Sequence, residues 1–121
     1  MVMPYAIANS RELTEEESDL LSYILQREHP HRTGEIASLE VVARCGCGKC
    51  PTVLFGESLK SAPKLGIFTE LANYIGRTAE GISVGIAVLE RDGQITELEA
   101  WSPEGDDIHS WPPLSALERI N

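Results

Sequence analysis

The chain has 121 residues, 42% hydrophobic and 24% charged, and ten basic against nineteen acidic residues give it a net charge of -9. This length fits one domain with one core, so we expect residues 1–121 to form a single domain in which residues 1–12 are loosely ordered. The charge argues against nucleic acid, which is bound by Lys and Arg, and without an apolar run of about 18 residues we expect no membrane partner and a cytoplasmic protein.

The first predicted element is a helix over residues 14–28. Thr14 is a typical N-cap residue, and Glu17 stands three residues later, as a capping box requires. Apolar residues recur at helical spacing and predict one buried face. These residues are Leu20, Leu21, Ile24 and Leu25. Pro30 cannot continue the helix, so we expect residues 29–31 to form a connecting loop.

A β-hairpin is predicted next, because residues 39–45 alternate with a period of two and residues 52–56 have β-type composition. With residues 46–49 as its loop, Cys45 pairs with Cys50, and both point to the more apolar face. The further pairs of that register are Ala43 with Thr52 and Val41 with Leu54.

The second half of the chain contains a clearer hairpin. Residues 82–91 and 94–101 flank Asp92-Gly93, which is typical of a type I′ turn. Pairing outward from the turn places Ala87, Leu89, Leu98 and Ala100 on one face and Val84, Ile86, Val88, Ile95, Glu97, Glu99 and Trp101 on the other. Residues 66–76 fit either a helix or a strand, and Pro113 predicts a last short helix.

Two motifs resemble a group of small uncharacterised bacterial proteins. They are RCGCG at residues 44–48, typical of that group's turn, and GIAVLERDGQITELEAWS at residues 85–102, similar to its LELE-aromatic-Ser strand. The resemblance covers roughly residues 13–120. It implies an N-terminal helix before a mostly antiparallel sheet, with residues 66–76 as a strand. The group has no assigned activity, so it implies no catalytic residue, and Lys49 departs from its denser cysteine spacing.

These elements predict an α+β fold, with the N-terminal helix packed on a mostly antiparallel sheet of about five strands built from hairpins. All three cysteines, Cys45, Cys47 and Cys50, lie within six residues of one another. Zinc is usually held by four thiolates and imidazoles, so the turn is a candidate zinc site with a fourth ligand from His29, His31, His109 or a carboxylate.

Other interpretations of the cysteine turn remain open. A Cys-x-x-Cys redox pair is disfavoured because a strand, not a helix, is predicted after it, and iron-sulfur ligation normally needs four thiolates. A labile disulfide between Cys45 and Cys50 under oxidation is a further, disfavoured alternative if they pair across the hairpin. We favour a structural role, in which these two cysteines are small inward residues. The turn is also a candidate anion-binding nest formed by Arg44, Gly46, Gly48 and Lys49.

The acidic residues cluster between Glu90 and Asp107, with seven acids against one base. Such a cluster is typical of a solvated surface and is also a candidate surface for a basic protein partner. We find no catalytic motif and no cofactor motif apart from the candidate zinc ligands. The sequence therefore predicts a small acidic, non-catalytic binding or protein-interaction module, with a zinc-binding module as the alternative.

Overall fold

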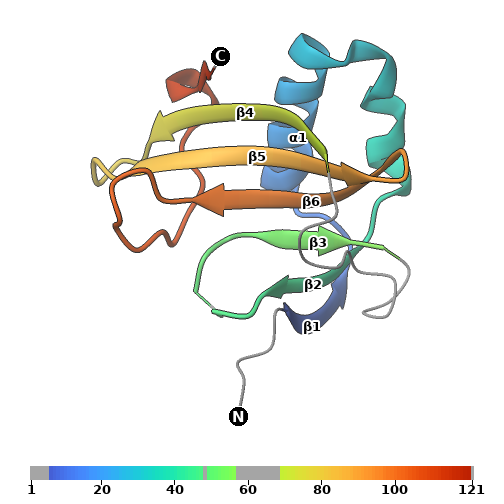
Figure 1. Cartoon of the computed structure of the whole chain (residues 1–121), viewed down its shortest axis with the longest axis horizontal. Coiled ribbons are helices and arrows are strands. Elements are labelled where there is room, and N and C mark those ends of the chain that lie inside the picture. Colours follow the sequence, from blue (N-terminus) through green and yellow to red (C-terminus); the bar gives the residue numbers. More distant parts are fainter. Residues whose placement is uncertain (1–5, 48, 57–68, 121) are drawn as a thin grey trace.

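The computed structural model describes residues 6–47, 49–56 and 69–120 (Figure 1). Within them the fold is α+β, as predicted, with helical segments packed on one seven-stranded antiparallel sheet. The prediction of about five strands was too low, because the structure adds a strand at each edge of the sheet. One of them, Ala6–Arg11, lies in the segment that we expected to be loosely ordered.

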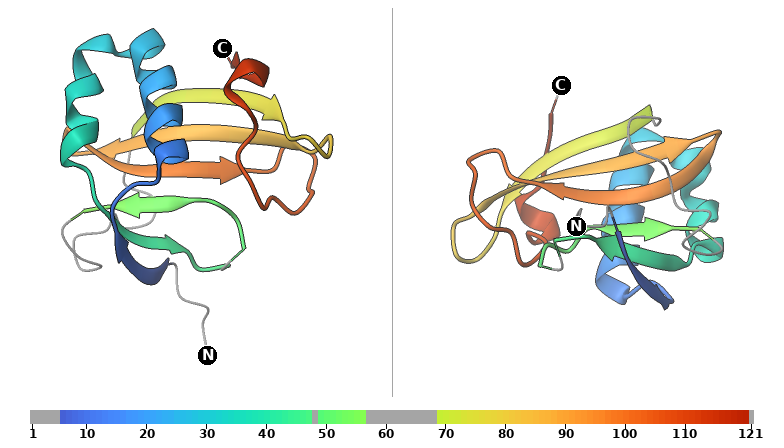
Figure 2. Two further views of the ribbon diagram at one scale, coloured as in Figure 1. Left: turned by 180° about the vertical axis from the view of Figure 1, so that it is seen from behind. Right: turned by 60° about the horizontal axis from the view of Figure 1, so that its bottom comes forward.

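The sheet contains the strands of the described residues in the order β1-β2-β3-β6-β5-β4-β7. They are β1 (Ala6–Arg11), β2 (Val41–Cys45), β3 (Val53–Phe55), β4 (Thr69–Arg77), β5 (Ser83–Arg91), β6 (Gln94–Trp101) and β7 (Glu118–Arg119). The helical elements are α1 (Glu15–Glu28) and the 3-10 helices η1 (Pro30–Ser38) and η3 (Leu114–Ala116). In Figure 2, α1 and the C-terminal segment cross the same face of the sheet, so the main core lies between them and the strands.

Helix α1 confirms the predicted capping box. The amide of Glu17 donates to Thr14 Oγ1 at 3.1 Å, and the amide of Thr14 donates to Glu17 Oε1 at 2.9 Å. The same carboxylate receives two bonds of 2.8 Å from the guanidinium of Arg11, the last residue of β1. The four predicted apolar residues are buried. Glu17 therefore fixes the start of α1 to the edge strand that precedes it.

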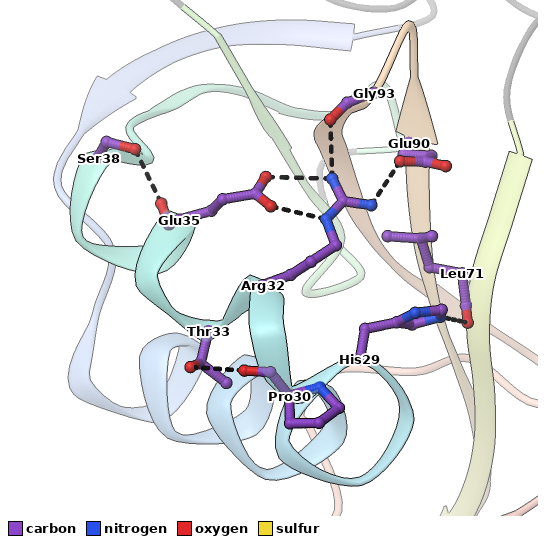
Figure 3. A network of polar contacts seen from close by, with 9 residues as sticks. All are labelled: His29, Pro30, Arg32, Thr33, Glu35, Ser38, Leu71, Glu90 and Gly93. Carbon is purple, nitrogen blue, oxygen red and sulfur yellow. Dashed lines mark hydrogen bonds and ion pairs between the residues drawn. The ribbon is translucent and has the colours of Figure 1, made fainter.

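The predicted loop after α1 is instead the start of η1. Pro30 occupies its first turn, where a missing N–H costs no helical hydrogen bond. Arg32 then fastens η1 to the β5–β6 hairpin (Figure 3). Its guanidinium donates to Glu90 Oε2 at 2.6 Å, to Glu35 Oε2 at 2.6 Å and to the Gly93 carbonyl at 2.8 Å. Charge-assisted bonds of this kind are stronger than neutral ones, so Arg32 fixes this end of the sheet.

The β2–β3 hairpin is present, but its predicted register was wrong. Arg44 pairs with Val53 and Ala43 pairs with Leu54, so the loop is longer than expected. Cys45 is opposite Thr52, whose carbonyl accepts its amide at 3.3 Å, and Cys50 belongs to the loop. The predicted cross-strand pair of cysteines is therefore replaced by a longer turn that contains two of the three sulfurs.

The β5–β6 hairpin has the predicted type I′ character, with φ of 54° at Asp92 and 81° at Gly93. A register shift between Leu89 and Glu90 moves the pairing of β6 by one residue. As a result Leu98 and Ala100 join the core face with Val88, and their predicted face was wrong. The predicted face was also wrong for Glu97, Glu99 and Trp101, which pair with Leu89, Ala87 and Gly85 on the other side. The shift is a β-bulge, which inserts an extra residue into one strand.

The remaining segments complete the sheet edge. Residues 69–77 form β4, which decides the ambiguous segment in favour of a strand, while residues 66–68 lie outside the described part. The predicted last helix is the single 3-10 turn η3, and Leu117 after it is buried. The chain then adds β7 alongside β4. No helix in the described ranges is long and apolar enough to cross a membrane.

Gly85 leaves room for an aromatic ring on the sheet. A Cβ at this position would lie 1.9 Å from Trp101 Cε2, so Gly85→Ala must displace the indole. That ring is held by a bond of 3.0 Å from Nε1 to Asn73 Oδ1. We expect a loss of about 1–3 kcal/mol in the free energy of unfolding, measured by urea titration. The control Gly34→Ala meets nothing within 4 Å and should stay close to wild type; equal effects would contradict this packing.

Glu17 makes stability depend on pH. Burial raises the pKa of its carboxyl, but the bonds from Arg11 and the Thr14 amide outweigh burial and hold it below its ordinary value of 4.5. Folding therefore favours the ionised form, and this stability is lost as pH falls through the folded pKa. At pH 7 we expect Glu17→Gln to cost about 1–3 kcal/mol, with a smaller cost in acid. Glu15→Gln, an exposed change in the same turn, is the control, and a pH-independent cost of Glu17→Gln would contradict the assignment.

Candidate metal site

The three cysteine sulfurs converge at the turn between β2 and β3. All three Sγ atoms lie within 4.8 Å of one another. In a tetrahedral zinc site with Zn–S bonds of about 2.3 Å, sulfurs are about 3.8 Å apart, so a contraction of about 1 Å or less brings these atoms to ligand spacing. Cys47 is exposed at the tip, as predicted, and Cys45 and Cys50 are half-buried. One cysteine of the group is therefore exposed to solvent, and the other two are partly covered by the protein.

Backbone amides of the turn are directed at Cys47. The N–H groups of Lys49 and Cys50 lie 3.4 and 3.3 Å from its Sγ. These amides, Cys50 first and then Lys49, lower the pKa of Cys47 to about 7. Burial has the opposite effect on Cys45 and raises the pKa of its thiol to about 12. The turn therefore distinguishes its sulfurs, and it stabilises the thiolate of Cys47.

Thr52 joins this turn to the centre of the sheet. Its side-chain oxygen lies 3.4 Å from Cys50 Sγ and accepts the amide of Ala100, near the end of β6, at 2.9 Å. The Cys50 thiol donates to this oxygen, and the Thr52 hydroxyl donates to the Ala100 carbonyl at 3.5 Å. A hydroxyl has one donor and two acceptor positions, so its hydrogen must rotate away from that carbonyl before it can be donated to a Cys50 thiolate. Thr52 is buried, with 5% of its surface exposed. Sequence reasoning missed this role, because a threonine at the start of a strand has no distinctive pattern.

The structure argues against the redox and anion-binding interpretations of the turn. All three cysteines are free, and Cys47-x-x-Cys50 leads into the strand β3 instead of a helix. Of the candidate anion-binding residues, Gly48 lies outside the described part, and the amide of Lys49 is directed at sulfur. Arg44 is half-buried at the end of β2. The described amides therefore favour a thiolate over an external anion.

A cavity of about 290 Å³ lies beside the turn, between it, the start of α1 and the loop after β6. Cys50, Thr52, Arg44 and His109 contribute to its wall. Of the three candidate histidines, His109 is thus the one that shares a cavity with the cysteine turn. In Figure 1 this turn and the loop after β6 lie at the same end of the sheet, whereas η1 lies at the other end.

The acidic residues of 90–107 do not form one exposed surface. Glu90 is paired with Arg32, Glu97 is buried with 4% of its surface exposed, and Glu99 is half-buried. Burial, and then the charge of Glu70, raise the pKa of Glu99. The exposed acids are divided between the β5–β6 turn and the loop after β6; they are Asp92, Glu104, Asp106 and Asp107.

Comparisons with known proteins add no assignment: no protein family, curated protein or solved structure matches the chain. The resemblance to small bacterial proteins with an RCGCG-type turn therefore stays a prediction from the two motifs. What the site can do must be inferred from its own geometry.

The two thiols with shifted pKa values should react at different rates. In protein kept reduced and free of metal by a chelator, we expect iodoacetamide to modify Cys47 first near neutral pH. Its rate should rise through a pH of about 7, because the thiolate is the nucleophile. Peptide mass spectrometry reports each cysteine separately, and Cys47→Ser should remove the fast reaction. If Cys45 reacts as quickly as Cys47, the described hydrogen bonds do not control reactivity.

Proposed function

We propose that this protein is a non-catalytic metal-binding module that holds a zinc ion through Cys45, Cys47 and Cys50. The convergence of the three sulfurs within 4.8 Å carries the proposal. Three structural cysteines of one short turn need not direct their sulfurs to a common point, whereas metal ligands must. Soft thiolate ligands select zinc or monovalent copper over magnesium and calcium, so the donor set also supports this class of metal.

The surroundings of the sulfurs support the same function. Amides directed at Cys47 and the hydroxyl beside Cys50 are outer partners of the kind that orient metal ligands and adjust their charge. Zinc has no redox chemistry of its own in proteins, and a cluster of thiolates is typical of sites in which the metal stabilises structure. In this chain zinc would cross-link the turn between β2 and β3.

An acidic surface for a basic partner has less support as a function. The acids that suggested it are divided among an ion pair, buried positions and two separate turns. A divided set of charges gives a weaker attraction than one continuous surface, because exposed charges more than about 8 Å apart are largely screened at physiological salt. The metal-binding alternative therefore becomes the principal proposal.

Metal analysis tests this function directly. Protein purified with added zinc and without chelator should contain close to one zinc per chain. At a free concentration 100 times its Kd, zinc should raise the free energy of unfolding by up to about 2.7 kcal/mol, and any binding to the cysteines of the unfolded chain lowers that figure. Elemental analysis and urea titration measure the two quantities.

Cys47→Ser should abolish both the zinc content and the stabilisation, and it changes an exposed residue. The control Ser110→Cys adds a thiol on the cavity wall and leaves the three ligands intact, so it should retain zinc. Wild-type protein without zinc at micromolar free metal, or a Cys47→Ser variant with the wild-type content, would contradict the proposed function.

A further inference from the structure

We propose that His109 supplies the fourth ligand and that the metal centre is a Cys3His zinc site closed across the cavity beside the cysteine turn. This inference rests on the proposed function and deepens it. Structural zinc sites are almost always four-coordinate, and Cys3His is one of their usual ligand sets. In the described residues, the group of converging ligand atoms contains three sulfurs and no histidine or carboxylate, so one position is left to fill.

Two of the three histidines are held elsewhere. His29 Nε2 donates to the carbonyl of Leu71 at 3.0 Å, and the ring of His31 lies edge-on to it, 6.1 Å away between centroids. His29 lies at the end of the sheet that Arg32 fastens (Figure 3), and His31 belongs to η1 at the same end. The cysteine turn lies at the other end (Figure 1). Bringing either imidazole to the sulfurs would require η1 to leave the sheet.

His109 differs from His29 and His31 in its location. It is exposed and contributes to the wall of the same cavity as Cys50. Its neighbours Ile108 and Trp111 are buried, with 7% and 6% of their surfaces exposed, and fix this stretch of the loop to the core. The backbone of His109 is therefore anchored at the cavity that Cys50 also lines, and the proposed site requires its imidazole to turn toward the sulfurs by side-chain rotation. A pre-positioned ligand of this kind loses little conformational entropy on binding.

The acids of the cavity wall are poorer candidates. Both carboxylate oxygens of Glu17 already accept hydrogen bonds from Arg11 and the amide of Thr14. Removing that carboxylate from its partners would uncap α1. Glu16 is exposed in the first turn of the same helix, and a hard carboxylate suits a thiolate-bound metal less well than an imidazole does.

A Cys3His site has a structural consequence. The cysteine turn follows β2 and the loop of His109 follows β6, so the metal would join two connections that are far apart in the sequence. Zinc binding should then order both connections together and close the cavity between them.

The first test compares zinc affinities by competition with a chromophoric chelator. His109→Ala should weaken zinc binding at least about 10-fold. Removing a residue that only hydrogen-bonds to a metal ligand already costs about that much metal affinity, and removing a ligand itself should cost no less. One matched control is His31→Ala, which removes an exposed histidine at the other end of the sheet. The other is Glu16→Gln, which removes the acid of the cavity wall that does not cap α1. Both should bind zinc as wild type does.

The second test observes the wild-type site and uses His109→Ala only to assign the resonance of the bound ring. Nitrogen-15 NMR of the histidine rings in the wild-type protein should show one imidazole with a metal-bound nitrogen after one equivalent of zinc, and it should be the ring absent from His109→Ala spectra. Unchanged affinity in His109→Ala, or no ring shift on zinc binding, would overturn the fourth ligand while leaving the three-thiolate site standing. Absence of zinc binding in wild type and in both controls would instead overturn the proposed function, and with it this inference.

Discussion

The short contact between β3 and β6 is the constraint on which the arrangement of the site depends. It joins the β1-β2-β3 half of the sheet to the β6-β5-β4-β7 half, and its register pairs Val53 with Leu98 and Leu54 with Glu97. The Thr52 side chain extends the contact by accepting the amide of Ala100 at 2.9 Å. Because β3 has three residues, this buried hydroxyl is a substantial part of the connection between the halves.

The site follows from that contact. The cysteine turn leads into β3 and the loop of His109 leaves β6, so pairing these two strands brings both connections to one end of the sheet (Figure 1). The same Thr52 that accepts from β6 lies 3.4 Å from Cys50 Sγ. A change in the β3–β6 pairing would therefore alter the position of the sulfurs. At the opposite end, Arg32 holds η1 and the β5–β6 turn together and keeps the other histidines away (Figure 3).

Local signals in the sequence were sufficient for the elements whose causes are local. The capping box at Thr14 and Glu17 and the Asp92-Gly93 turn are set by residues within a few positions of each other, and both were predicted correctly. The edge strands β1 and β7 were missed, because a two-residue strand and a strand near the terminus depend on partners far away in the chain. The β-bulge near Glu90 was missed for the same reason, and it changed the face of Leu98.

The candidate site was predictable only in part. Three cysteines within six residues identified the candidate ligands, but an assumed tight loop paired Cys45 with Cys50, whereas the longer loop gathers the sulfurs instead. The sequence named three histidines as equivalent candidates, and only the cavity shared by Cys50 and His109 distinguishes one of them. Thr52 was outside any pattern, because its partner Ala100 lies on a strand 48 positions later.

X-ray absorption at the zinc edge of the zinc-loaded protein tests the central claim most directly, because it reports the atoms bound to the metal. Three cysteine ligands predict a dominant sulfur shell at about 2.3 Å containing three sulfurs, with one lighter nitrogen neighbour at about 2.0–2.1 Å. Replacing Cys47 by Ser should reduce the sulfur shell. A first shell made only of oxygen and nitrogen atoms would mean that zinc binds elsewhere on this acidic chain, and it would contradict the assignment of the cysteine turn as a metal site.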